Sequence, residues 1–211
     1  MHDTLSAFLL VYAGLFPVVN PLGSAPIFLA MTDSCSDQER NRLAATVSIN
    51  SFWLLLGSML GGSLILEVFG ITVPVVRVAG GLLLATMGWK VLNDGHTGDD
   101  PKSTSADVTP GQSFYPLTLP LTVGPGVIAV AITLGSHRPH GPDFLMQVGA
   151  GVAGLVAMAL TVYVCYRSAE NLARALGQTG IGILIRLSAF ILICIGIQIC
   201  WSGVKALIQS L

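Results

Sequence analysis

The sequence predicts an all-α membrane protein with six transmembrane helices, arranged as two inverted three-helix repeats. The first and fourth helices are expected to be broken or re-entrant near the midplane. Three observations predict this fold class. Of the 211 residues, 53% are hydrophobic and only 10% are charged, against roughly 25% charged in an average soluble domain. Six apolar stretches are long enough to span a bilayer, and the first and fourth carry prolines at one shared spacing.

A transmembrane helix needs about 20 mostly apolar residues, and six segments meet this requirement. They are residues 5–31, 43–66, 73–92, 114–134, 144–166 and 181–207. The longest connection is rich in Gly, Asp, Ser, Thr and Pro, which is typical of a flexible linker. We therefore divide one membrane domain into a first repeat (1–92), a linker (93–113) and a second repeat (114–211).

Basic residues in the predicted loops indicate the orientation of the chain. The connections after the first, third and fifth spans hold Arg40, Arg42, Lys90, Lys102, Arg167 and Arg174. The opposite side holds Arg138 and Lys205. Because cytoplasmic loops are enriched in Lys and Arg, we expect the first set of loops inside the cell and both termini outside.

The prolines of the first and fourth spans follow one pattern, an aromatic residue followed by Pro-x3-Pro-x4-Pro. The two copies begin at Phe16 and Tyr115, and their prolines are Pro17, Pro21 and Pro26, then Pro116, Pro120 and Pro125. A proline removes a backbone donor and clashes with the carbonyl one turn back. Each predicted half has an odd number of spans, so the second half inserts upside down relative to the first. Paired helix breaks in inverted halves are the sequence pattern of a transporter binding site.

Polar and small residues accompany the prolines at the same depth. A broken helix exposes carbonyl oxygens at one end and amide N–H groups at the other. The N–H end suits a carboxylate, and the carbonyl end suits an ammonium group or a cation. This pattern predicts a site for a small neutral zwitterion, such as an amino acid, with a possible coupling cation. The candidate binding residues are Asn20, Pro21, Gly23, Ser24, Pro120, Thr122, Gly124, Pro125 and Gly126. Packing kinks are the alternative interpretation.

Two arginines lie inside apolar sequence, Arg77 near the start of the third span and Arg186 near the start of the sixth. An ionisable residue within the membrane is a functional candidate. A long basic side chain near a helix end also reaches the interface easily. Both residues are therefore candidates for a gate or for an anchor.

The sequence also argues against several classes of protein. A net charge of −1 gives no basic patch for nucleic acid. The four cysteines show no CxxC or metal-like spacing, and we find no nucleophile–base pair, phosphate loop or dinucleotide fingerprint. We therefore expect no cofactor, no metal and no enzymatic activity, and we expect the lipid bilayer as partner. The oligomeric state is left open.

Several short motifs resemble those of the MarC family of bacterial inner-membrane proteins, also grouped as six-helix neutral amino acid transporters. They are Asn20-Pro21-Leu22-Gly23, Gly124-Pro125-Gly126, Phe69-Gly70-Ile71 followed by Arg77-Val78-Ala79-Gly80-Gly81, and Thr179-Gly180-Ile181 followed by Arg186-Leu187. One departure is the Ser188-Ala189 pair, where the family usually keeps a glycine. The resemblance implies a multi-pass protein of the bacterial inner membrane that transports small neutral amino acids such as alanine or glycine. The alternatives are a non-transporting membrane protein with a regulatory or partner-binding role, or an exporter of another small solute.

Overall fold

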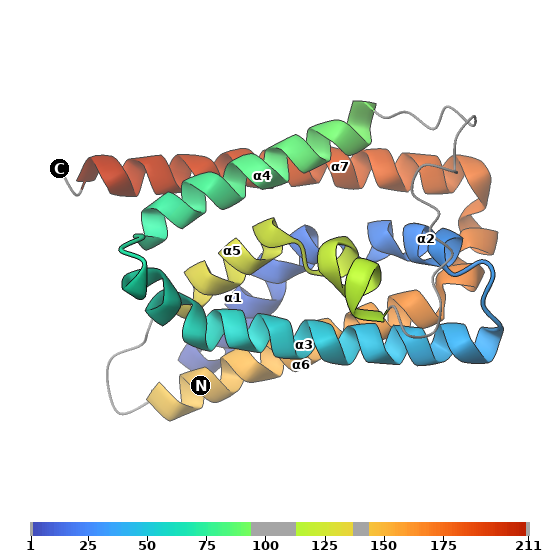
Figure 1. Cartoon of the computed structure of the whole chain (residues 1–211), viewed down its shortest axis with the longest axis horizontal. Coiled ribbons are helices and arrows are strands. Elements are labelled where there is room, and N and C mark those ends of the chain that lie inside the picture. Colours follow the sequence, from blue (N-terminus) through green and yellow to red (C-terminus); the bar gives the residue numbers. More distant parts are fainter. Residues whose placement is uncertain (1, 94–112, 137–143, 210–211) are drawn as a thin grey trace.

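The computed structural model describes residues 2–93, 113–136 and 144–209, and every regular element in these ranges is a helix (Figure 1). The prediction of an all-α fold is confirmed. In chain order the elements are α1 (His2–Val19), α2 (Pro21–Met31), α3 (Asp37–Val68), α4 (Val73–Asn93), η2 (Ser113–Thr122), α5 (Pro125–Ser136), α6 (Phe144–Arg167) and α7 (Ala169–Gln209). The predicted linker lies almost entirely outside the described residues.

By length and composition, four helices could cross a membrane, namely α3, α4, α6 and α7. Six spans result if the bent pairs α1–α2 and η2–α5 each count as one. The bends are 43° and 69°. In each pair the second segment continues toward the far end of the bundle (Figure 1), as expected for a broken span.

Two helices begin well before the spans that their apolar residues predict. A capping box starts α3 early, because the Ser36 N–H donates to Glu39 Oε2 at 2.9 Å and the Glu39 N–H donates to Ser36 Oγ at 3.4 Å. Helix α7 begins at Ala169 and bends at Gly177, where φ is +63°. Our limit for the second span was too short because hydropathy marks the apolar part of a helix and misses its polar first turns. The candidate span within α7, Thr179–Gln209, begins after the kink and agrees with our limits of 181–207.

The first helix break lies at Asn20, which has left-handed backbone angles of φ 48° and ψ 56°. Pro21 disfavours helical geometry at the residue before it, and Asn tolerates the left-handed region better than most residues. The Asn20 Oδ1 atom then accepts a hydrogen bond from the Gly23 N–H at 3.2 Å. The residue that interrupts the helix therefore also caps the next one.

The second broken segment bends between Thr122 and Pro125, and its first part, η2, is itself irregular rather than one continuous helix. Tyr115 and Leu119 have extended backbone angles, with φ of −123° and −112°, and each precedes a proline, as steric exclusion predicts. The peptide bonds before Pro116 and Pro120 are cis. Leu119 occupies the same place in its motif as Asn20, directly before the second proline. Both segments are therefore non-helical at the residue before the second proline of their motif.

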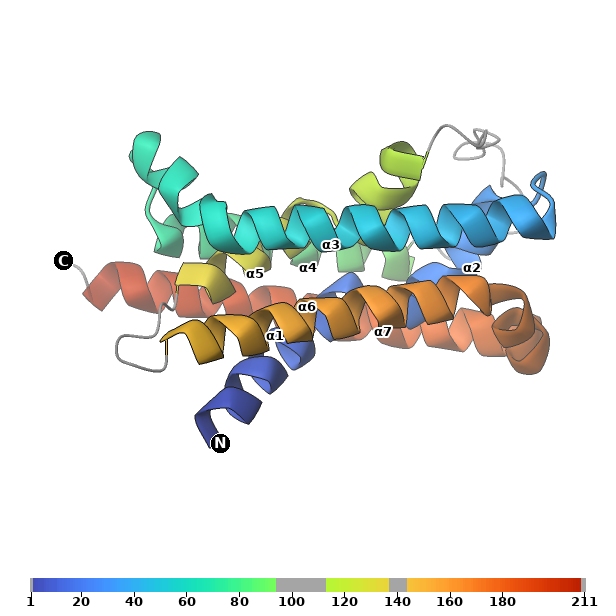
Figure 2. The same cartoon turned by 90° about the horizontal axis from the view of Figure 1, so that it is seen from below.

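The broken segments lie between two pairs of long helices (Figure 1). Helices α4 and α7 pack side by side and run in opposite directions, as do α3 and α6. In both views the N-terminus of α1 lies near the start of α6, away from the α6–α7 junction (Figure 2). The α2–α3 and α6–α7 connections and the end of α4 share one end of the bundle, and both chain termini lie toward the other.

Helices α4 and α7 touch through their backbones along a line that we call the glycine seam, formed by Gly81, Gly88, Gly196 and Gly203. A methyl group added at Gly196 would lie 2.5 Å from the Ala85 nitrogen and 2.6 Å from the Gly81 oxygen. Small residues allow such close approach, which van der Waals packing between membrane helices requires. The seam therefore joins the third helix of the first half to the last helix of the second.

Candidate functional site

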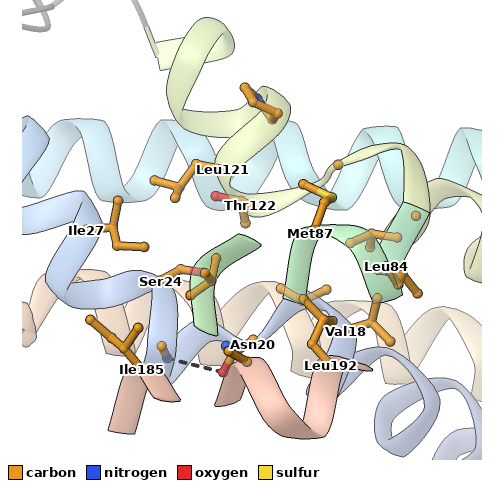
Figure 3. Close-up of a pocket in the computed structure, with 18 of the residues that line it drawn as sticks. Val18, Asn20, Ser24, Ile27, Leu84, Met87, Leu121, Thr122, Ile185 and Leu192 are labelled. Carbon is orange, nitrogen blue, oxygen red and sulfur yellow. Dashed lines mark hydrogen bonds between the residues drawn. The ribbon is translucent and has the colours of Figure 1, made fainter. Parts of the chain in front are cut away.

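A pocket of about 320 Å³ lies between the two helix breaks. Figure 3 shows its side chains converging from the α1–α2 break, from α4, from the η2–α5 segment and from α7. Seven of the nine predicted binding residues line it: Asn20, Gly23, Ser24, Pro120, Thr122, Gly124 and Gly126. Pro21 and Pro125 do not line it; each stands at the first position of the following helix. Two segments almost a hundred residues apart thus share one pocket.

The lining of the pocket is uncharged among the residues that the structure describes. Its polar side chains are those of Asn20, Ser24 and Thr122, and the rest of the wall consists of aliphatic residues, methionine, proline and glycine, including Leu84 and Met87. An apolar wall with a few placed polar groups is typical of a small-molecule site. The arrangement suits a solute without net charge.

The two helices that start at the pocket differ in their free amides. At α2, Asn20 accepts from the Gly23 N–H, so one of the first amides is already capped. At α5, Pro125 has no N–H, and the Ile128 N–H donates to the Gly124 oxygen at 3.1 Å. Gly126 and Val127 both line the pocket, and first-turn amides have no acceptor within their own helix. The α5 end is therefore the stronger donor toward a bound anion.

Behind the polar side chains lies Tyr166, at the end of α6. Its side chain is fully buried, and its ring stacks on Phe28 of α2 at 4.4 Å between centroids. Its hydroxyl lies 2.8 Å from Thr122 Oγ1. Sequence reasoning missed Tyr166, because no motif marks it. The structure places it in contact with both broken segments.

The two candidate arginines lie outside the pocket lining. Arg186 is exposed on α7, one residue after the lining residue Ile185. Arg77 is half-buried beside the glycine seam, and its Nε atom has no hydrogen-bond partner in the described part of the chain. Their role as gate or anchor stays a prediction. Within the described ranges no group of three or more His, Cys, Asp or Glu side chains could hold a metal ion.

Four long apolar helices, together with two bent pairs around an uncharged pocket, define a multi-pass integral membrane protein. Residues 5–208 match the family model described as MarC family integral membrane protein. The chain belongs to the MarC family, as its motifs predicted.

Several proteins are similar in sequence to this chain over its whole length. The UPF0056 inner membrane protein MarC of Salmonella typhimurium is 33% identical over 220 residues, which cover 100% of this chain and 99% of the relative. The protein of the same name from Citrobacter koseri is 33% identical over 219 residues, with the same coverage. The UPF0056 membrane protein of Buchnera aphidicola is 31% identical over 214 residues, again with 100% and 99% covered. No solved structure matches the chain.

Proposed function

We propose that the protein is a secondary transporter or exporter of small neutral amino acids, similar to alanine, glycine or serine. The observation that carries this proposal is the uncharged pocket of about 320 Å³ bounded by both helix breaks. Small-molecule sites span about 300–1,000 Å³, so this volume favours a small solute. The proposal involves binding and movement of the solute, without a catalytic step.

The α5 end of the pocket supports the choice of a zwitterion. A carboxylate placed against the amides of Gly126 and Val127 would satisfy donors that lack acceptors in their own helix. The uncharged walls would disfavour a solute with an ionised side chain, because a buried charge needs a partner. A neutral amino acid meets both conditions.

We infer further that the two halves form an inverted repeat that moves by alternating access. Three observations support this inference. Helices α3 and α6, and α4 and α7, run in opposite directions. The contact of α4 with α5 has its counterpart in the contact of α7 with α2. Each motif has a non-helical residue directly before its second proline, at Asn20 and at Leu119. In this arrangement the halves rock around a site at their interface.

We also propose that the end of the bundle holding Arg40, Lys90, Arg167 and Arg174 faces the cytoplasm of the bacterial inner membrane. The basic residues of that end follow the positive-inside pattern. Alkaline phosphatase fused to the C-terminus tests the orientation, since the enzyme is active only outside the cytoplasm. An inactive fusion, with an active one at the α2–α3 connection, would reverse the assignment.

Transport is tested with purified protein in liposomes and labelled alanine, glycine and serine, with and without sodium or proton gradients. Asn20→Leu removes the cap, and Gly124→Leu puts a side chain beside Pro120 and Met87. We expect both to abolish flux. Gly57→Leu is the matched control, because a Cβ there meets no atom within 4 Å. Flux that both pocket variants leave unchanged would reject the site.

The same preparation separates the other functions that the sequence left open. Flux of a non-amino-acid solute from a panel, with none for the three amino acids, would support an exporter of another solute. No flux and no thermal shift with any solute would support a regulatory or partner-binding protein instead.

A further inference from the structure

Helix α4 presents two apolar side chains, those of Leu84 and Met87, to the start of α5. Both residues line the pocket. A methyl group added at Gly126 would lie 2.5 Å from Leu84 Cδ2, and one added at Gly124 would lie 3.8 Å from Met87 Cε. Figure 3 shows both side chains beside the turn that joins η2 to α5. They therefore border the α5 amides that we assign to a carboxylate.

The pocket becomes more enclosed along this face of α4 toward α5. Leu84, Met87 and Val91 follow the helical spacing that places residues on one face, and all three line the pocket. Their exposed fractions are 3% at Leu84, 39% at Met87 and 40% at Val91. A solute held at the first turn of α5 therefore lies at the enclosed end, where Leu84 and Met87 bound the space beside it.

The α-carbon of an amino acid carries both the carboxylate and the side chain. A carboxylate bound at the amides of Gly126 and Val127 therefore brings the solute's side chain close to the α4 wall. We propose that Leu84 and Met87 limit the size of this side chain, and so select glycine, alanine and serine over valine and leucine. A closely packed apolar wall resists added methylene groups, because its own side chains must shift to admit them. The inference rests on the proposed transport of amino acids.

The test measures binding of glycine, L-alanine and L-valine by calorimetry on the full-length protein in lipid nanodiscs. We expect the wild-type protein to bind alanine at least about tenfold more tightly than valine, the scale of one methylene group in an apolar pocket. Leu84→Ala and Met87→Ala each make room beside α5, and each should lower the ratio of alanine affinity to valine affinity about tenfold. Glycine has no side chain, so neither change should tighten its binding.

Two further variants show whether the effect belongs to this wall. Leu83→Ala is the matched control, because Leu83 is the neighbour of Leu84 on α4, is exposed and does not line the pocket; we expect its ratio to stay unchanged. Ile27→Ala shortens a side chain on the α2 wall of the pocket instead. Leu84→Ala empties a buried position and costs stability. Met87→Ala changes a partly exposed residue, so it serves if Leu84→Ala does not fold.

The outcomes separate this inference from the proposed function. A wild-type ratio in the α4 variants that fold overturns the inference and leaves amino acid transport standing. A fall with Ile27→Ala alone also overturns it, since the solute's side chain would then lie against α2. Wild-type protein that binds alanine and valine equally overturns it as well. Wild-type protein that binds none of the three amino acids overturns the proposed function, and the inference falls with it.

Discussion

Replacing Asn20 by glycine and by alanine separates the two tasks of this residue at the first helix break. Asn20 holds a left-handed backbone conformation, and its side chain caps the Gly23 N–H at 3.2 Å. Alanine removes the cap and also resists the left-handed region. Glycine removes the cap but adopts that region without a steric penalty. The difference between the two variants therefore measures the conformational task alone.

The expected magnitudes follow from these two terms. Loss of the cap costs a few tenths of a kcal/mol when glycine replaces the capping residue, and a left-handed residue with a Cβ costs about 1–2 kcal/mol. Asn20→Ala should therefore lower the free energy of unfolding by about 1–2.5 kcal/mol, the sum of these terms. Asn20→Gly should cost only a few tenths of a kcal/mol.

The free energies are measured by titrating detergent-solubilised protein with SDS and following helix content by circular dichroism. Asn93→Ala is the control, because the Asn93 side chain lies exposed at the end of α4, where it donates to the Trp89 oxygen. We expect that change to cost less than about 0.5 kcal/mol. Equal costs for the glycine and alanine variants would refute the assigned backbone strain, and no cost for either would refute the cap.

Three further changes test the packing of the bundle. Gly196→Ala should lower the free energy of unfolding in the same titration by about 1–3 kcal/mol, because the added methyl overpacks the glycine seam. Gly182→Ala is the control and should be neutral, because its methyl meets no atom within 4 Å. Equal effects of the two changes would contradict close packing at the seam. Phe28→Ala empties a fully buried position and should cost about 3–5 kcal/mol, so an unchanged melting temperature would argue against its burial. Glu170→Gln removes exposed ion pairs with Arg40 at 3.8 Å and with Arg174 at 3.5 Å and should cost less than about 1 kcal/mol, a difference that added salt should shrink.

The helices and their breaks could be predicted from the sequence where neighbouring residues alone produce them. Apolar runs of sufficient length predicted the spans, and the two proline motifs predicted the two breaks, because a proline removes a backbone donor and clashes with the carbonyl one turn back. The sequence left a broken span and a re-entrant hairpin equally open. That choice depends on how the segments pack. The bends of 43° and 69° fit either alternative, and the continuation of each second segment toward the far end of the bundle favours a broken span (Figure 1).

Pocket residues that come from distant parts of the chain could not be predicted from the sequence. Leu84, Met87 and Ile185 line the pocket, yet no pattern separates an apolar residue that faces a pocket from one that faces lipid. Tyr166 lies 44 residues from Thr122 in the chain, and a tyrosine at the end of a span is typical of the membrane interface. Proline and glycine motifs mark backbone geometry, so they indicated the residues at the breaks and none of those around them.

The glycine seam has a consequence for how the bundle responds to temperature. Lipid chains are as apolar as the surfaces that meet in the seam, so its closure moves no apolar surface out of water. The heat-capacity change that accompanies hydrophobic burial is therefore absent from this joint. Its energy comes from many atom pairs worth about 0.1–0.2 kcal/mol each. Cooling, which weakens hydrophobic cores, should leave the contact between α4 and α7 at full strength.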